Sequence, residues 1–131
     1  MKLTYQRALW AAYTVLDRLY NDNDPYKLGE ILSEMNPFLF TSRVCADPYL
    51  WEVWTDCCKA IDDSGYLTFE QVLPTLVDFL KFNEEEYSCF EEYGGNYSAD
   101  EVISGISEYV KNGQWQEILD KVYNFDEKNW D

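Results

Sequence analysis

Apolar residues recur at helical spacing along most of this chain. In the first twenty residues they fall on one face, at intervals of three and four: Leu9, Ala12, Tyr13, Leu16 and Tyr20. This pattern predicts an amphipathic helix. We expect the helix to begin at Leu3-Thr4 and to end at Asn21-Asp22-Asn23, where polar, turn-forming residues follow one another.

Three further helices begin at a capping signal. Asp24 and Asp47 each precede a proline, which is typical of an N-cap followed by the first helical residue. The first of these helices should end at Asn36-Pro37, because the residue before a proline is displaced from helical geometry. Ser98 opens a capping box, and Asn112-Gly113 ends its helix. A final amphipathic helix follows these three. In chain order, the residues expected on the inner faces of the four helices are Leu28, Ile31, Leu32 and Met35; Leu50, Val53, Trp54, Cys57 and Ile61; Val102, Ile106, Tyr109 and Val110; and Trp115, Ile118, Leu119 and Val122.

The segment after Thr68 has two interpretations. Thr68 and Gln71 have the spacing of a capping box, but Pro74 would interrupt the hydrogen bonds of a helix begun there. Either residues 68–73 form a separate turn, or the helix begins near Pro74. We further expect Asn83 to cap a new turn led by glutamates, with Gly94-Gly95 ending it.

The remaining segments predict loops. Residues 38–46 are apolar enough for a strand but have no evident partner, so we expect a loop held by Phe38 and Phe40. Leu3-Thr4-Tyr5 is echoed at Leu67-Thr68-Phe69, which we interpret as shared helix-start chemistry. The sequence therefore predicts an all-α fold, a single-domain bundle of about six helices with short loops spanning residues 1–131, in which residues 124–131 form a frayed tail.

The net charge of the chain says more about its possible partners than any sequence motif does. The 131 residues include 25 acidic and 10 basic ones, for a formal charge of −15. A field of this sign repels phosphate backbones and anionic lipid, and it attracts basic proteins. The charge could also serve solubility alone. No targeting segment or membrane span is evident, so we expect a cytoplasmic protein with reduced thiols, in which Cys57 is buried and Cys58 is partly exposed.

The sequence offers little for catalysis or for metal binding. It contains no histidine, which removes the commonest general base and most zinc sites. Asp62-Asp63-Ser64-Gly65 resembles part of a calcium loop, but Ala60 and Gln71 then occupy the first and twelfth ligand positions, where Asp and Glu are needed. We therefore expect a polar turn between helices, with no catalytic residue, cofactor or metal.

The strongest candidate for a binding site mixes acidic and aromatic residues. Carboxylates around tyrosines suit lysine and arginine clusters on a partner. An ordinary solvated helix face, with Phe90 in the core, explains the same pattern. The candidate partner-binding residues are Glu84, Glu85, Glu86, Tyr87, Glu91, Glu92 and Tyr93, with Asp62 and Asp63 as a second patch.

Two segments, Leu28 to Met35 and Ala46 to Trp54, carry a family resemblance. The first is rich in leucine and contains a glycine, and the second combines Asp47-Pro48 with Trp51 and Trp54. Over residues 7–60 the chain resembles small bacterial immunity proteins of contact-dependent and polymorphic toxin systems. It departs from them between Pro37 and Cys45, where an apolar loop replaces the expected polar one.

The resemblance implies a cytoplasmic protein that binds and neutralises a cognate toxin. Many such toxins are nucleases with a basic substrate site, which an acidic helical face could cover. Two alternatives remain: an acidic nucleic-acid mimic that inhibits a restriction or CRISPR nuclease, and an acidic adaptor. The expected partner is the cognate toxin domain, a basic protein, and we expect no direct contact with nucleic acid or membrane.

Overall fold

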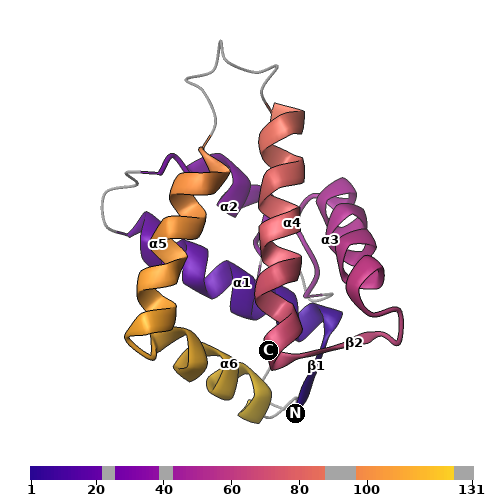
Figure 1. Cartoon of the computed structure of the whole chain (residues 1–131). Helices are drawn as coiled ribbons and strands as arrows, with labels where there is room; N and C mark the ends of the chain where they lie inside the picture. The colour runs from indigo at the N-terminus through magenta and orange to yellow at the C-terminus, as the bar shows by residue number, and fades with distance from the viewer. Residues whose placement is uncertain (22–25, 39–42, 88–96, 126–131) are drawn as a thin grey trace.

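The computed structural model describes residues 1–21, 26–38, 43–87 and 97–125 and confirms the predicted all-α class. Six helices and a small two-stranded sheet make up the regular structure of these residues (Figure 1). In chain order the elements are β1 (Lys2–Thr4), α1 (Tyr5–Tyr20), α2 (Gly29–Met35), α3 (Pro48–Ile61), β2 (Tyr66–Thr68), α4 (Phe69–Tyr87), α5 (Ala99–Lys111) and α6 (Gln114–Asn124).

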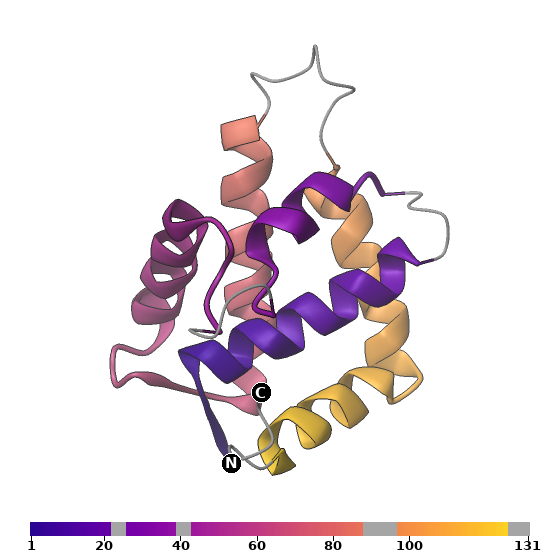
Figure 2. The same ribbon diagram turned by 180° about the vertical axis from the view of Figure 1, so that it is seen from behind.

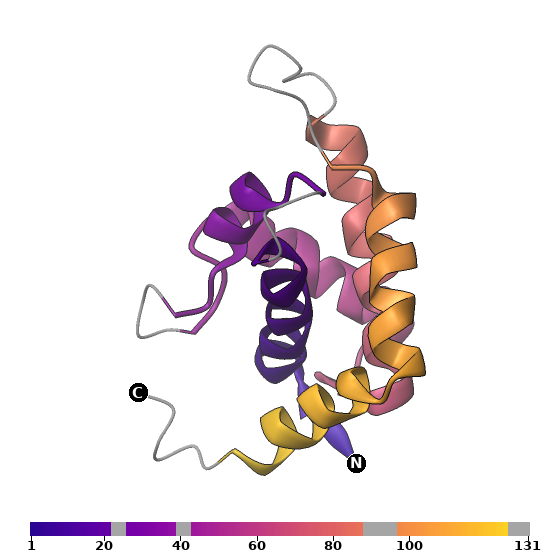
Figure 3. The same ribbon diagram turned by 90° about the vertical axis from the view of Figure 1, so that its left-hand side faces the viewer.

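Helix α1 is the centre of the molecule. It packs against each of the other five helices, and Figure 2 shows it lying across the middle of the fold. In Figure 3, α4 and α5 lie on one side of it and α2 on the other. Three alanines, Ala8, Ala11 and Ala12, are fully buried on its inner face. Because alanine has no side chain beyond Cβ, neighbouring helices can approach α1 closely at these positions.

Most helix ends fall where the local signals place them. The Asp47 carboxylate accepts a hydrogen bond from the backbone N–H of Tyr49, and the Ser98 hydroxyl accepts one from that of Glu101. Helix α1 ends at Tyr20, and α2 ends at Met35. Gly113, with φ of 83°, separates α5 from α6 in a left-handed conformation that glycine adopts without a steric penalty. Asp24 and Pro25 lie outside the described residues, and α2 begins only at Gly29.

The segment around Pro74 corrects both sequence interpretations. Helix α4 runs unbroken from Phe69 to Tyr87, and the Gln71 side chain accepts a hydrogen bond from the backbone N–H of Thr68 at 2.8 Å. Pro74 and Glu70 are exposed, so the Glu70 carbonyl that loses its partner lies on the solvent side of the helix. Asn83 does not cap a new turn. It is buried, and its side chain donates to the Phe79 carbonyl at 2.8 Å.

The echo between Leu3-Thr4-Tyr5 and Leu67-Thr68-Phe69 has a structural meaning that the sequence did not reveal. The two segments pair as antiparallel strands, with Leu3 opposite Leu67, and each strand leads directly into a helix. Both leucines are buried. The stretch from Asp62 to Thr68 is therefore a turn followed by a strand, and not only the polar turn we expected.

Other expectations need smaller corrections. Cys58 is fully buried and Cys57 only partly so, the reverse of the prediction. Phe125 is not frayed, because its ring meets that of Trp10 edge to face, with centroids 4.8 Å apart. Phe38 contacts Trp10 and Tyr13 in the same manner, as the loop prediction required. Phe40 and residues 126–131 lie outside the described residues.

The hydroxyl of Tyr5 forms hydrogen bonds with the turn at Asp62 to Gly65, the segment that resembles part of a calcium loop. Tyr5 donates its O–H to the Asp62 carbonyl and accepts the backbone N–H of Gly65 at 3.1 Å. The backbone carbonyl of Tyr5 in turn accepts the indole N–H of Trp54 at 2.9 Å. Gly65 has a φ of 93°, which the turn requires. The turn between α3 and β2 is thus held by α1 through the Tyr5 hydroxyl.

Tyr5→Phe removes this hydroxyl and both of its hydrogen bonds to the turn. We expect a loss of about 1–3 kcal/mol in the free energy of unfolding, because each of the two hydrogen bonds contributes about 0.5–1.5 kcal/mol. Urea unfolding followed by circular dichroism measures it. Tyr66→Phe, at an exposed position in the same region, should change stability little, and millimolar calcium should not shift the melting temperature of either protein. A calcium-dependent rise would contradict this account of the turn.

Candidate functional site

Among the described residues, the predicted partner-binding side chains lie in two places, as the sequence analysis expected. Glu84, Glu85, Glu86 and Tyr87 form the last turn of α4. Asp62 and Asp63 follow α3, on the side of the molecule where α4 begins (Figure 1). Between Phe69 and Glu84 the helix rises roughly 22 Å at 1.5 Å per residue. The second patch is therefore separate from the first. Glu91, Glu92, Tyr93 and Phe90 lie outside the described residues.

Asp62 has a structural task within its turn. Its carboxylate accepts the backbone N–H of Ser64 at 3.0 Å. Hydrogen bonds from the Ser64 hydroxyl and backbone lower the pKa of Asp62, with smaller contributions from Gln71 and the charge of Lys2. A carboxylate engaged in this way closes the turn. Asp63 is exposed beside it.

Glu84 also has a structural task. Its carboxylate accepts the backbone N–H of Ala99, the first residue of α5. A negative charge at this position complements the positive end of the α5 dipole. Two residues earlier in the chain, the buried Tyr97 hydroxyl donates to the Leu80 carbonyl of α4 at 2.6 Å. Burial raises the pKa of Tyr97, and the charge of Glu84 raises it further. These contacts join the end of α4 to the start of α5.

The exposed part of the predicted site continues onto α3. Glu85 and Glu86 are exposed, and the Tyr49 hydroxyl at the start of α3 donates to the Glu86 carboxylate at 3.3 Å. Helix α3 packs along α4. The outer residues of the two helices on this side form a surface that we call the α3–α4 face; it consists of Tyr49, Glu52, Asp56, Asp78, Phe82, Glu85 and Glu86.

Two pKa shifts show that carboxylates gather on the α3–α4 face. Partial desolvation raises the pKa of Tyr49, and the nearby charges of Glu86 and Glu52 add to it. Burial raises the pKa of Cys57 to about 11, with contributions from the charges of Asp78 and Asp56. Each shift includes a charge from α3 and one from α4, so carboxylates of the two helices lie near each other both at Tyr49 and at Cys57.

Two aromatic side chains are exposed among these carboxylates. Tyr49 is 49% and Phe82 is 41% exposed. Phe82 lines an open hollow with Glu85 and Glu86, its neighbours at three and four residues along α4. Exposed aromatic side chains are enriched at protein interfaces, where they bury a large area at small entropic cost. The face thus combines negative charge with apolar contact area.

The sequence analysis missed five of the seven residues of this face. Tyr49, Glu52 and Asp56 recur at three- and four-residue spacing opposite the apolar stripe of α3, a signal that was available. Phe82 was visible as an apolar residue outside the buried stripe of α4. Asp78 shares this signal, because it stands four residues before Phe82 and eight before Glu86.

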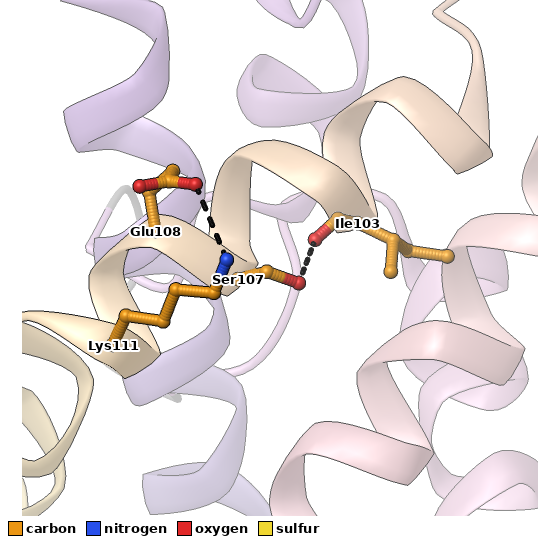
Figure 4. A network of polar contacts seen from close by, with 4 residues as sticks. All are labelled: Ile103, Ser107, Glu108 and Lys111. Carbon is orange, nitrogen blue, oxygen red and sulfur yellow. Dashed lines mark hydrogen bonds and ion pairs between the residues drawn. The ribbon is translucent and has the colours of Figure 1, made fainter.

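Carboxylates of α5 and α6 are partly offset by lysines one turn away. Glu108 pairs with Lys111 at 3.7 Å, and Glu117 with Lys121 at 3.4 Å. Figure 4 shows the first pair on α5, beside the hydrogen bond from Ser107 to the Ile103 carbonyl at 3.0 Å. All four side chains are exposed, and such pairs contribute little to stability. These surfaces present less net negative charge than the count of acidic residues suggests.

The described residues offer no metal site and no reactive thiol. Among them, no three His, Cys, Asp or Glu side chains come together as metal ligands. Burial raises the pKa of Cys45 to about 12 and raises that of Cys58 as well. Thiols with raised pKa values are poor nucleophiles at neutral pH. No helix in this part of the chain is long and apolar enough to cross a membrane.

Comparison with known proteins adds no relative. No protein-family model, no curated protein and no solved structure matches this chain.

Proposed function

We propose that this chain is an immunity protein that binds a cognate, basic, nuclease-type bacterial toxin and neutralises it in a stoichiometric complex. The observation that carries the proposal is the α3–α4 face, on which five exposed carboxylates lie along two packed helices together with two exposed aromatic side chains. The resemblance of residues 7–60 to immunity proteins supports the same function. In this proposal the chain acts in the cytoplasm and catalyses no reaction.

The chemistry of nucleases explains why this face fits. A nuclease binds the phosphates of its substrate with lysine and arginine side chains. A protein face rich in carboxylates attracts the same side chains and speeds the encounter. Aromatic side chains then supply contact area that water cannot replace. The bound protein excludes the nucleic acid because both need the same basic surface.

Inhibition of a purified toxin tests the proposal. A tagged chain is used to capture partners from the organism that encodes it, and a captured nuclease domain is then purified. We expect nuclease activity to fall in proportion to added protein and to vanish at one molecule per toxin, and co-expression should restore growth. A nuclease that keeps its activity when saturated with this protein would overturn the proposal. Inhibition of a restriction or CRISPR nuclease instead would favour the mimic.

A further inference from the structure

The chain contains one Asn-Gly pair, Asn112-Gly113, and this pair forms the turn between α5 and α6. Both residues are exposed. We propose that Asn112 is a site of spontaneous deamidation and that one product of the reaction loosens the connection between the two helices. The reaction needs no partner, so it is independent of the proposed function.

The chemistry of the pair defines the reaction. The backbone nitrogen of Gly113 attacks Cγ of Asn112, a new C–N bond forms, and the bond from Cγ to Nδ2 breaks. The side-chain amide leaves as ammonia with the proton of the Gly113 N–H, and a cyclic imide remains. Water then opens the imide at either carbonyl group and gives aspartate or isoaspartate. Glycine permits the attack because it has no Cβ to crowd the approach.

Two hydrogen bonds of the folded turn restrain this attack. The Oδ1 atom of Asn112 accepts the backbone N–H of Gln114 at 3.0 Å, and the Gly113 N–H donates to the Val110 carbonyl at 3.3 Å. The ψ angle of Asn112 is 4°, which directs the Gly113 nitrogen away from Cγ. The turn must therefore open before the new bond can form. Exposed helix ends open locally at much lower cost than the whole fold, so the native chain can react.

The two products affect the turn differently. Aspartate keeps the main chain and an oxygen acceptor for the Gln114 N–H, and its charge lies between the negative end of the α5 dipole and the positive end of the α6 dipole, whose effects oppose each other. Isoaspartate instead leads the main chain through the former side chain, which adds a methylene group between the helices and displaces this acceptor. The far end of α6 stays attached to α1, because Arg7 donates to the Val122 and Tyr123 carbonyls. Isoaspartate should therefore loosen α6 at its first turn.

Incubation of the full chain at mildly alkaline pH tests the site. Peptide mass spectrometry follows each asparagine, and an isoaspartyl methyltransferase assay measures isoaspartate. We expect Asn112 to deamidate in the folded chain roughly five- to a hundredfold more slowly than in the chain unfolded in urea, because two hydrogen bonds of the turn must break first. Asn124 is the internal control: it is exposed at the other end of α6, but the side chain of Phe125 crowds the attacking nitrogen. Asn124 should remain intact.

Hydrogen exchange of the separated products tests the consequence for α6. The isoaspartate form should exchange faster at the Gln114 and Glu117 amides, which bond to the turn, while the Val122 amide stays protected. Asn112→Asp should exchange like the original chain, and Asn112→Ser, which keeps an oxygen acceptor without the amide, should form no isoaspartate. Three results would overturn the proposal: an Asn112 that stays intact in the folded chain while it reacts in urea, equally fast reaction of Asn124, or an isoaspartate form whose first α6 turn exchanges no faster.

Discussion

Glu85→Lys combined with Glu86→Lys is expected to slow association with the basic partner by about tenfold or more at low salt, within the range that electrostatic steering covers. The substitutions turn two attractive charges of the α3–α4 face into repulsive ones at exposed positions. Both side chains are at the last turn of α4 and away from the core, so the fold should persist. Stopped-flow or surface-plasmon measurements at several salt concentrations give the association rate.

The control for this variant changes net charge equally at another place. Glu108→Lys with Glu117→Lys alters exposed residues of α5 and α6 and breaks two weak ion pairs. If association depends on total charge alone, both double variants will slow it to the same extent, and the α3–α4 face loses its special role. A larger effect for Glu85 and Glu86 that fades as salt rises would place the partner on this face.

Trp54→Ala is expected to lower the free energy of unfolding by about 3–5 kcal/mol, as large-to-small changes of buried tryptophan do. The Trp54 side chain is fully buried and meets the Phe79 ring edge to face, with centroids 5.3 Å apart. Its indole N–H also donates to the Tyr5 carbonyl. Small domains are stable by only about 5–15 kcal/mol, so part of the population should unfold. Urea titration followed by circular dichroism measures the loss.

Trp51→Ala on the same helix provides the comparison, because Trp51 is only partly buried. It should cost less than half as much as Trp54→Ala. Equal losses at the two positions would contradict the described orientation of α3, in which one indole faces the core and the other lies at its edge.

Helix limits were predictable because their causes are local. Asp47 with Pro48, and Ser98 with Glu101, contain within a few residues both the donor and the acceptor of the cap. Pro74 misled the sequence interpretation because its cost depends on whether the Glu70 carbonyl reaches solvent, which the local sequence does not determine. Cys57 and Cys58 follow Trp54 at three and four residues, and both spacings suit an inner face. Only the packing of α3 decides between them.

Features that join distant segments were beyond the sequence. The pairing of Leu3 with Leu67 needs two three-residue strands to meet, and strands this short carry no pattern of their own. Likewise, Glu84 is indistinguishable from Glu85 and Glu86 in the sequence. Only the fold shows that its carboxylate accepts the backbone N–H of Ala99 at the start of α5. The sequence therefore indicated an acidic, aromatic-rich end of α4, but it could not separate the carboxylate that caps α5 from the two exposed ones.

The strand pair has a consequence for how this chain folds. Residues of β1 and β2 meet only after the chain between them, with α1, α2 and α3, has been drawn together, and closing a long flexible segment costs entropy. Helices form faster than such distant contacts. We therefore expect the helices to form early and β1 to join β2 near the end of folding, so that the first residues of the chain are among the last to reach their native places.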